Sequence, residues 1–457
     1  MNGLTSRETE ILDYISKGHT NVEISDFLKI SENTVKVHIS NLYKKLNVTN
    51  RTEAALHYKN DMVSVEYENK IFYIKPLLIL DLFSYDALDC SDTFKNEYFT
   101  TQLQAKLLAG LAHRNIFSIF KDTASIPKDI DNINGYRISG SIHKTSDKVN
   151  ITVYLESYPK QLHIWSNIFH ESIDDYDLDL IINKIIASLM YNLISKESST
   201  SLELEVKERN IFQNILLGFH LSSLADSKLL LKAQNLFDSI LTLTPCHIHA
   251  LYGRGVVSYI LIMTGLSNNP STDYLILKNC CTSIKEISKN CVEYWFIRGL
   301  IALLDQDVKG AVILFENALR LDLSRQETLL MLAQLYTALG DYSNAKLYLD
   351  KTILLCPDFQ YKGRNLLATS IIYFGVRQYE NAIKLLEENF YMQEKNIFST
   401  LLYICSLYYA GHTQKACDLS KDVTISQQYI KRIFSLSNED ILSRLLTAFD
   451  HAGIKIT

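Results

Sequence analysis

The stretch that decides the fold of the N-terminal region is residues 30–46, which read ISENTVKVHISNLYKKL. Its apolar residues recur at spacings of four, three and four, and they are Val35, Ile39, Leu42 and Leu46. This spacing places them in one stripe along a helix, where they can pack against other helices. Ser31 precedes the stripe and belongs to the residue types that favour the N-cap position. The sequence therefore predicts a helix that begins after Ser31.

Two shorter helices are predicted upstream of this one. Thr5 with Glu8 forms a capping-box signal for the first, and Thr20 with Glu23 forms one for the second. Apolar residues at helical spacing follow each signal; they are Ile11, Leu12 and Ile15 in the first helix and Ile24, Phe27 and Leu28 in the second. Gly18 provides a stop between the two. Three helices thus make a small bundle.

The face of the third helix opposite its apolar stripe is the informative one. It carries Asn33, Val37, Ser40, Asn41 and Lys44, and it is flanked by Lys36, His38 and Lys45. An outward Val37 has no packing role in a free domain, whereas in a DNA major groove a small apolar group can contact a thymine methyl. The alternative is a bundle whose charged face is only solvated. Residues 1–60 carry nearly equal numbers of basic and acidic residues, so charge alone does not decide.

The whole of residues 4–58 resembles the LuxR/FixJ/GerE family of four-helix DNA-binding domains. The matching residues are Leu4-Thr5-Ser6-Arg7-Glu8, Gly18, Asn21, Glu23-Ile24, Leu28, Ile30-Ser31, Thr34-Val35-Lys36-Val37-His38, Lys45-Leu46, Val48, Arg51 and Ala54. The resemblance implies that the third helix enters the major groove, with Lys36, Val37 and Ser40 facing base edges. It also implies that Lys45 and Arg51 help to hold phosphates.

The remaining assignments on this domain extend that resemblance. We expect Asn33 and Asn41 to face bases, and His38 and Lys44 to reach phosphates. Family members often have a basic or amide side chain where Ser40 stands, so base preference at that step cannot be carried over. The family's fourth helix commonly pairs with its twin on DNA. The corresponding residues are Ala54, Ala55 and Tyr58, and we therefore expect a homodimer on double-stranded DNA.

Between residues 70 and 197 the periodicity changes and indicates an α+β domain with a mixed sheet. The run at residues 77–80 reads as a buried strand, because it is continuously apolar. A helix at 93–114 follows, then a strand at 116–120, three alternating strands and a helix at 174–193. The three strands are predicted at residues 136–143, 149–154 and 162–169.

This segment resembles the small domain at the amino-terminal end of TolB. The resemblance is carried by Tyr136, Gly140-Ser141-Ile142, Val149-Asn150-Ile151 and Ile164-Trp165-Ser166. The segment contains no Gly-rich phosphate loop. Its histidines have no recognisable nucleophile and base beside them. We therefore predict no catalytic residues and no enzyme activity.

From residue 203 to about 450 the sequence is helical and repetitive. Trp295, Gly299, Ala311, Phe315, Ala318 and Leu323 recur 34 residues later as Leu329, Ala333, Ala345, Leu349, Thr352 and Pro357. This period resembles the tetratricopeptide motif, in which small residues let paired helices approach closely. Weaker copies on both sides predict about six helix pairs, and a three-residue excess after Ala345 predicts an irregular solenoid. Such an array presents a concave surface for a protein partner or another effector.

Composition limits the remaining possibilities. A net charge of -5 excludes nucleic-acid binding by bulk charge, so DNA must be bound by a local face. Eight cysteines without a signal peptide favour reduced thiols in the cytoplasm. They and the Cys246-His247-Ile248-His249 stretch lack a two-plus-two metal-ligand spacing, so we predict neither metal nor cofactor. The longest apolar stretch, residues 256–266, is too short for a membrane span.

The sequence thus predicts a multidomain, mostly α protein with domains at 1–62, 70–197 and 203–450. Its predicted function is that of a cytoplasmic, sequence-specific transcription regulator, and an activator, controlled through its repeats. Because the helix-turn-helix begins at residue 4, we expect no receiver domain before it. No Gly-x-x-x-x-Gly-Lys motif occurs, so we expect no ATPase activity. The alternatives are a scaffold or adaptor whose N-terminal helices contact protein, and an enzyme with its site in the middle domain.

Overall fold

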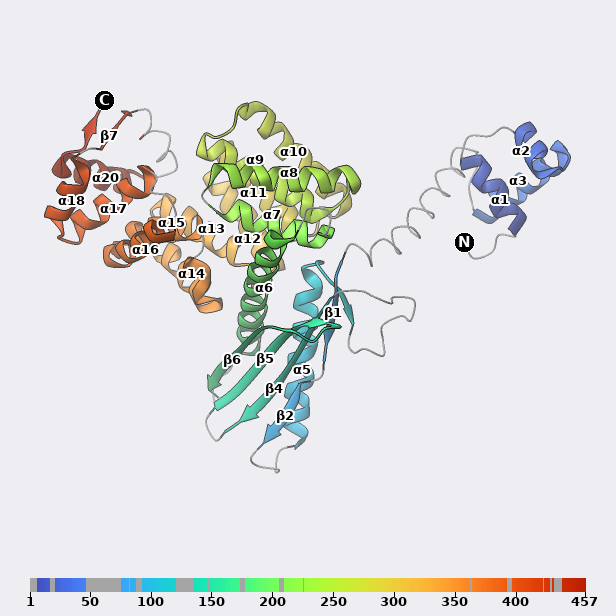
Figure 1. Ribbon diagram of the computed structural model, residues 1–457, viewed down its shortest axis with the longest axis horizontal. Coiled ribbons are helices and arrows are strands. Elements are labelled where there is room, and N and C mark those ends of the chain that lie inside the picture. The colour runs from blue at the N-terminus through green and yellow to red at the C-terminus, as the bar shows by residue number, and fades with distance from the viewer. Residues whose placement is uncertain are drawn as a thin grey trace. The chain divides into compact units, whose positions relative to one another are not determined.

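Figure 1 shows the computed structural model of the chain. The residues it describes are 6–16, 21–46, 75–81, 83–87, 93–120, 135–145, 148–172, 177–204, 209–224, 226–361, 364–392, 397–421, 423–427, 430 and 438–457. Contacts divide the chain into two compact units, Met1–Pro76 and Leu77–Thr457. The two units are described separately.

The N-terminal unit contains the three predicted helices. They are α1 (Ser6–Ser16), α2 (Asn21–Leu28) and α3 (Glu32–Leu46). Their shared core is made of Ile11, Ile15, Ile24, Val35 and Ile39, all buried. The Ser31 hydroxyl accepts the backbone N–H of Thr34 at 3.1 Å, which caps α3 as predicted. Phe27 departs from the expected apolar side of α2, because it is 54% exposed and its ring stacks on Tyr14.

The second unit begins with a mixed sheet. Its strands are β1 (Leu77–Leu80), β2 (Ser84–Ala87), β3 (Ser118–Phe120), β4 (Gly135–Lys144), β5 (Lys148–Tyr158) and β6 (His163–Ser172). The order is β3-β1-β4-β5-β6, with parallel pairing on both sides of β1 and antiparallel pairing from β4 onward. The short β2, which pairs with β4, is the one described strand of this sheet that the sequence pattern did not predict. The predicted mixed sheet is confirmed.

Two helices cover one face of this sheet, α5 (Thr93–His113) and α6 (Leu178–Glu203). Leu103 and Leu107 of α5 and Ile185 of α6 are fully buried in the same core as the strand residues. Burial along β5 alternates, as expected for a sheet with one packed face. Of the described helices, α6 alone has the length and hydropathy of a membrane span, and half of its apolar window is buried inside the protein. It is the central core helix of this unit.

The rest of the unit is a helical solenoid (Figure 1). Its six helix pairs are α7 (Ile211–Ser223) with α8 (Ser227–Leu243), α9 (Ile248–Thr264) with α10 (Pro270–Ile287), α11 (Val292–Leu304) with α12 (Val308–Leu321), α13 (Gln326–Leu339) with α14 (Tyr342–Leu355), α15 (Arg364–Gly375) with α16 (Tyr379–Met392), and α17 (Ile397–Tyr409) with α18 (Thr413–Ser420). A single-turn helix, η4 (Pro357–Tyr361), follows α14. The helix α20 (Glu439–Ala452) ends the array, and two short strands, β7 (Thr424–Ile425) and β8 (Lys455–Ile456), pair beside it.

Small residues let the paired helices approach, as the repeat pattern predicted. A Cβ atom on Gly299 of α11 would lie 2.6 Å from the ring of Phe315 on α12, which is shorter than the contacts that Cβ atoms make in real structures. Phe315 itself is fully buried between its own pair and the next. Ala311 and Ala345 are likewise fully buried at equivalent positions. The motif residues therefore act through packing.

The sheet region and the solenoid are joined by direct contacts. Arg114, at the end of α5, lies 3.2 Å from Asp322 and donates to the Ser324 hydroxyl at 2.9 Å. Tyr191 of α6 donates to the carbonyl of Asp358. Burial alone would raise the pKa of Asp322, but Arg114 and Ser324 lower it below its usual value. These contacts hold residues 77–457 together. The predicted domain boundary between residues 197 and 203 stays a prediction.

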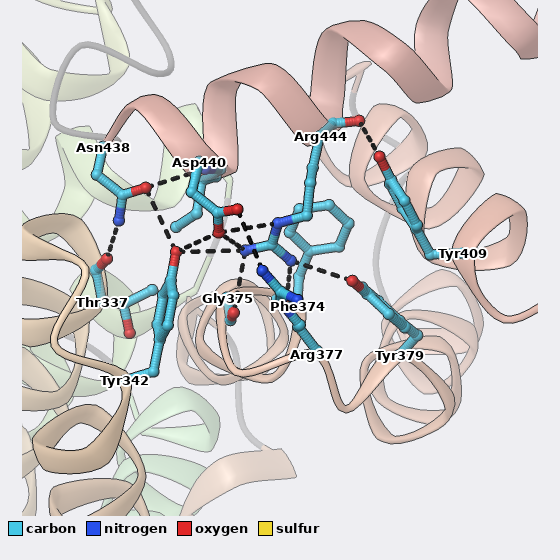
Figure 2. Close-up of polar contacts among 11 residues, drawn as sticks. Thr337, Tyr342, Phe374, Gly375, Arg377, Tyr379, Tyr409, Asn438, Asp440 and Arg444 are labelled. Carbon is cyan, nitrogen blue, oxygen red and sulfur yellow. Dashed lines mark hydrogen bonds and ion pairs between the residues drawn. The ribbon is translucent and has the colours of Figure 1, made fainter.

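The last helix is tied to the ends of two earlier ones (Figure 2). Asn438 caps α20 by accepting from Ile441 N, and its amide donates to the Thr337 carbonyl near the end of α13. Arg444 donates to the last carbonyls of α15, those of Phe374 at 2.8 Å and Gly375 at 3.0 Å, and pairs with Asp440 at 2.8 Å. A cation at a helix C-terminus satisfies unpaired carbonyls and the helix dipole. This network anchors α20 against the solenoid.

Candidate nucleic-acid interface

The residues that we predict to read DNA, here called the reading face, lie on α3. Asn33, Lys36, Val37, Ser40 and Asn41 are all exposed, on the side of the helix opposite to its buried stripe. Val37 lies at the centre of this face and is 60% exposed, although valine is normally a core residue. The helix thus presents a short polar and basic surface with an apolar group in its middle.

Lys36 is the basic residue closest to this centre. Its ammonium lies 2.8 Å from the Glu32 carboxylate one turn earlier, and both side chains are well exposed. An exposed pair of this kind contributes only about 0–1 kcal/mol. A phosphate or a base acceptor can therefore replace Glu32 at small cost, so the pair does not prevent Lys36 from contacting DNA.

Lys45 is placed differently. Its ammonium lies 2.7 Å from the carboxylate of Glu8 on α1, and Glu8 is only 5% exposed. Removing one partner of a buried ion pair costs roughly 3–5 kcal/mol. Lys45 itself remains 40% exposed, so its ammonium also faces solvent. The structure therefore gives Lys45 a role in holding α1 to α3, which the sequence pattern did not reveal.

The other predicted contacts are only partly described. His38 is partly buried beside the reading face. The side chain of Lys44 lies outside the described residues, and so do Arg51 and the predicted dimer residues Ala54, Ala55 and Tyr58. The assignments of these residues stay predictions.

A tight turn joins α2 to α3, and the end of α2 is also held by α1. Lys29 adopts a left-handed conformation with φ of 51°, and the N–H of Ile30 donates to the Ser25 carbonyl. Arg7 of α1 donates to the Leu28 carbonyl at 2.8 Å, which satisfies the C-terminal end of α2. Arg7 is one of the residues that carry the family resemblance, and the sequence pattern did not reveal this contact. Two short helices, a tight turn and an outward-facing third helix define a helix-turn-helix domain.

Comparison with known proteins identifies the family of this domain. Residues 2–58 match the bacterial regulatory proteins of the luxR family, and residues 326–359 match the tetratricopeptide repeat. Over 62 residues the chain is 48% identical to the transcriptional regulatory protein LiaR of Bacillus subtilis, covering 13% of this chain and 29% of LiaR. Over 58 residues it is 53% identical to the CsgBAC operon transcriptional regulatory protein of Escherichia coli, covering 13% and 26%.

A solved structure is weakly similar to part of the chain. It is a tetratricopeptide repeat protein from Parabacteroides merdae, with 17% identity and a TM-score of 0.30, matched over 59% of this chain and 97% of that one. The chain spans only about a quarter of the length of the curated relatives that it matches. The predicted luxR-type domain and the predicted tetratricopeptide repeat are confirmed. The TolB resemblance of residues 70–197 stays a prediction.

No metal centre is formed by the described residues. They contain no cluster of three or more His, Cys, Asp or Glu side chains that could hold an ion. Cys280 is buried, and burial raises its pKa to about 11, so this thiol is neutral at physiological pH.

Proposed function

We propose that this protein is a sequence-specific DNA-binding transcription regulator that reads the major groove with α3. The observation that carries the proposal is the exposed Val37, surrounded by Lys36, Ser40, Asn33 and Asn41. In this proposal Val37 contacts a thymine methyl, and the polar side chains form hydrogen bonds with base edges. The luxR-family match of residues 2–58 supports it.

Phosphate contacts position the helix in the groove. We assign them to His38, Lys44, Lys45 and Arg51. The attraction to phosphates must come from these residues locally, because the chain as a whole carries a net charge of -5 and would be repelled by DNA. We further propose that the protein binds as a homodimer through Ala54, Ala55 and Tyr58, and that it acts in the cytoplasm as an activator.

The repeats are the proposed site of control. Tetratricopeptide-like arrays offer a long concave surface, and here this surface belongs to the same compact unit as the mixed sheet. In this proposal a protein partner or another effector bound there changes how the N-terminal domain occupies DNA. The reading of sequence and the reception of a signal then belong to different parts of the chain.

The test is selection of bound sequences from random duplex DNA, followed by affinity measurement on the selected site. The full chain is compared with a Lys36→Ala, Val37→Ala double variant and with Ile313→Ala as a matched control. Ile313 lies on α12 and is 58% exposed, so its loss removes a comparable apolar group far from α3 in sequence. We expect the double variant to lose about 10- to 100-fold in affinity and to relax the selected sequence, because each good base contact contributes about 1–3 kcal/mol.

The competing function is a scaffold or adaptor whose N-terminal helices contact protein. It predicts that the full chain selects no sequence. It also predicts that the double variant and the Ile313→Ala control bind DNA equally weakly. That outcome would refute the proposal that the exposed face of α3 reads the DNA sequence.

A further inference from the structure

A cavity of about 780 Å³ lies within the repeat region. The first helices of the six pairs line it, together with parts of α6 and α20; no second helix contributes. Most of its walls are apolar, as with Phe219, Tyr259, Leu300, Ile371 and Phe398. Its volume falls in the range of about 300–1,000 Å³ that is typical of small-molecule sites. The concave side of the solenoid thus encloses a space suited to an apolar body.

Four lysine, arginine or acidic side chains are found among the described residues that line the cavity, and three of them are paired. Arg114 lies against Asp322, and Arg325 lies 2.8 Å from the buried Glu293 and 3.9 Å from Glu327. Burial alone would raise the pKa of Glu293, but Arg325 and His249 lower it below its usual value. In these pairs two arginines meet three carboxylates, so they carry one net negative charge, which lies around Arg325.

Arg364, at the start of α15, is the fourth charged residue. Its Nε donates to the Ser222 carbonyl of α7 at 3.1 Å, and no carboxylate pairs with it among the described residues. Burial lowers the pKa of its guanidinium to about 10. Arg364 is partly buried. A partly buried arginine without a carboxylate partner favours an anion beside it. Only its Nε is used in the bond to Ser222, and its terminal nitrogens are not among the buried polar atoms that lack a partner, so they can form a bidentate contact.

We propose that this cavity binds an amphipathic monoanion, a carboxylic acid with an apolar body, whose carboxylate pairs with Arg364. Binding would place a carboxylate beside the cavity-lining guanidinium that has no carboxylate partner among the described residues, and the apolar walls would remove the ligand's body from water. A ligand with two or more negative charges is disfavoured, because further charges would be desolvated without partners. A single carboxylate on an acyl or aromatic body is the chemistry that fits.

Helix α20 connects this site to the network of Figure 2. Ile441 and Leu445 of α20 line the cavity, and Arg444 between them holds the helix to the carbonyls of α15. Arg364 lies at the other end of that same α15. Helix α20, which forms one wall of the site, is therefore anchored to the C-terminal end of α15, whereas Arg364 lies at the first residue of α15.

The test is isothermal titration of the full chain at pH 8 with sodium decanoate and, separately, with decan-1-ol. We expect decanoate to bind at one molecule per chain and at least tenfold more tightly than the alcohol, because it alone can form the charge-assisted pair. Arg364→Met should abolish that difference while leaving the alcohol unchanged, and Arg364→Lys should keep part of it. Arg320→Met, an exposed arginine on α12, is the matched control and should change neither.

A filling variant separates the apolar contribution from the charge. Ala338→Trp adds bulk to a residue of α13 that lines the cavity, and it should weaken both decanoate and decan-1-ol. Unfolding temperatures of every variant check that the chain still folds. Equal decanoate affinity in the native chain and Arg364→Met would overturn the proposal, as would binding of many molecules per chain. Tighter binding of the uncharged peptide acetyl-Leu-Leu-Leu amide than of decanoate would also overturn it, in favour of a peptide site.

The role of this ligand as the effector rests on the proposed function. It is tested by measuring affinity for the selected DNA with and without saturating decanoate, in the native chain and in Arg364→Met. We expect a change of about fivefold or more in the native chain, a typical coupling, and none in the variant. Decanoate binding without any DNA binding would refute the proposed function and leave the cavity site standing. DNA binding without decanoate binding would refute the cavity site alone.

Discussion

The reading face of α3 and the cavity of the repeats both combine apolar surface with positive charge, but they are built in opposite ways. On α3 one helix supplies everything, with Val37 60% exposed beside Lys36. In the cavity Arg364 comes from α15, the carbonyl that holds it comes from α7, and the apolar walls come from helices spread over more than 200 residues. The first is an exposed surface, and the second is enclosed by the packing of the array.

This difference has a physical consequence for how each can fail. A contact surface on one helix is lost by changing one or two exposed side chains, and the fold survives because those side chains pack against nothing. The cavity depends on the positions of whole helices, so residues that never touch a ligand can destroy it. The expected effects of substitution should therefore be largest in the repeats.

The largest expected effect is that of Arg444→Met. The substitution leaves the last carbonyls of α15 and the Asp440 carboxylate without the cation that they share. We expect a loss of about 3 kcal/mol in the stability of the unit that contains the repeats, residues 77–457, here called the repeat unit. Urea unfolding followed by circular dichroism measures it. Arg320→Met serves as the exposed control and should change stability by less than about 0.5 kcal/mol. DNA affinity should stay unchanged; a loss of DNA affinity without a loss of stability would break the comparison.

The next effect concerns the N-terminal unit. Lys45→Met removes the ammonium that lies 2.7 Å from the buried Glu8 carboxylate, and we expect the unit to lose about 2 kcal/mol of stability. Hydrogen exchange in α1 and α3 measures the loss. The double variant Lys45→Met, Glu8→Gln should regain most of it, because the buried side chain at position 8 then carries no charge. If Lys45→Met weakened DNA binding with exchange unaltered, Lys45 would be a phosphate contact rather than a structural link.

A smaller effect is expected from acid. The folded pKa of Asp322 is held below its usual value, so the ion pair with Arg114 contributes stability that is fully present above about pH 4. That contribution disappears as the pH falls through the lowered folded pKa. Urea midpoints of the repeat unit should therefore decline below pH 4 in the native chain and less steeply in Asp322→Asn. Identical acid profiles for the two proteins would show that the junction does not depend on this charge.

The smallest effect is expected at Ser40, which is exposed on the reading face. Ser40→Arg should leave the dependence of DNA affinity on salt nearly unchanged, because in the proposed arrangement this position faces base edges and the new guanidinium neutralises no further phosphate. Gel-shift titrations between about 50 and 200 mM salt measure the slope. Ser40→Ala is the neutral control. A slope that increases by about one unit in the arginine variant would place position 40 at the DNA backbone and contradict its assignment to bases.

Much of the fold was predictable because its signals are local. The stripe Val35, Ile39 and Leu42 has the helical period, so the orientation of α3 follows from spacing alone, and the outward Val37 follows from the same period. The 34-residue recurrence of small residues predicted the paired helices for the same reason. The strand β2 was missed because its sequence, Ser84–Ala87, shows no run of apolar residues, and its pairing with β4 comes from tertiary contact.

The contacts between distant residues could not be predicted in this way. Glu8 has the pattern of a capping-box residue, yet its carboxylate meets Lys45, which is 37 positions away. Arg364 has the appearance of an ordinary helix residue until Ser222, 142 positions earlier, is found beside it. Arg444 likewise meets carbonyls about 70 positions away.

The sequence by itself determined the helix-turn-helix, its outward face and the repeating helix pairs, because helical periodicity and capping act over a few residues. The tertiary structure decided which of the described charged side chains at the cavity have a charged partner, and that Arg364 has none. It also decided that the first helices of the pairs enclose a cavity and that α20 is anchored over it. These features depend on burial and on distances between segments far apart in the chain, and no local pattern encodes them.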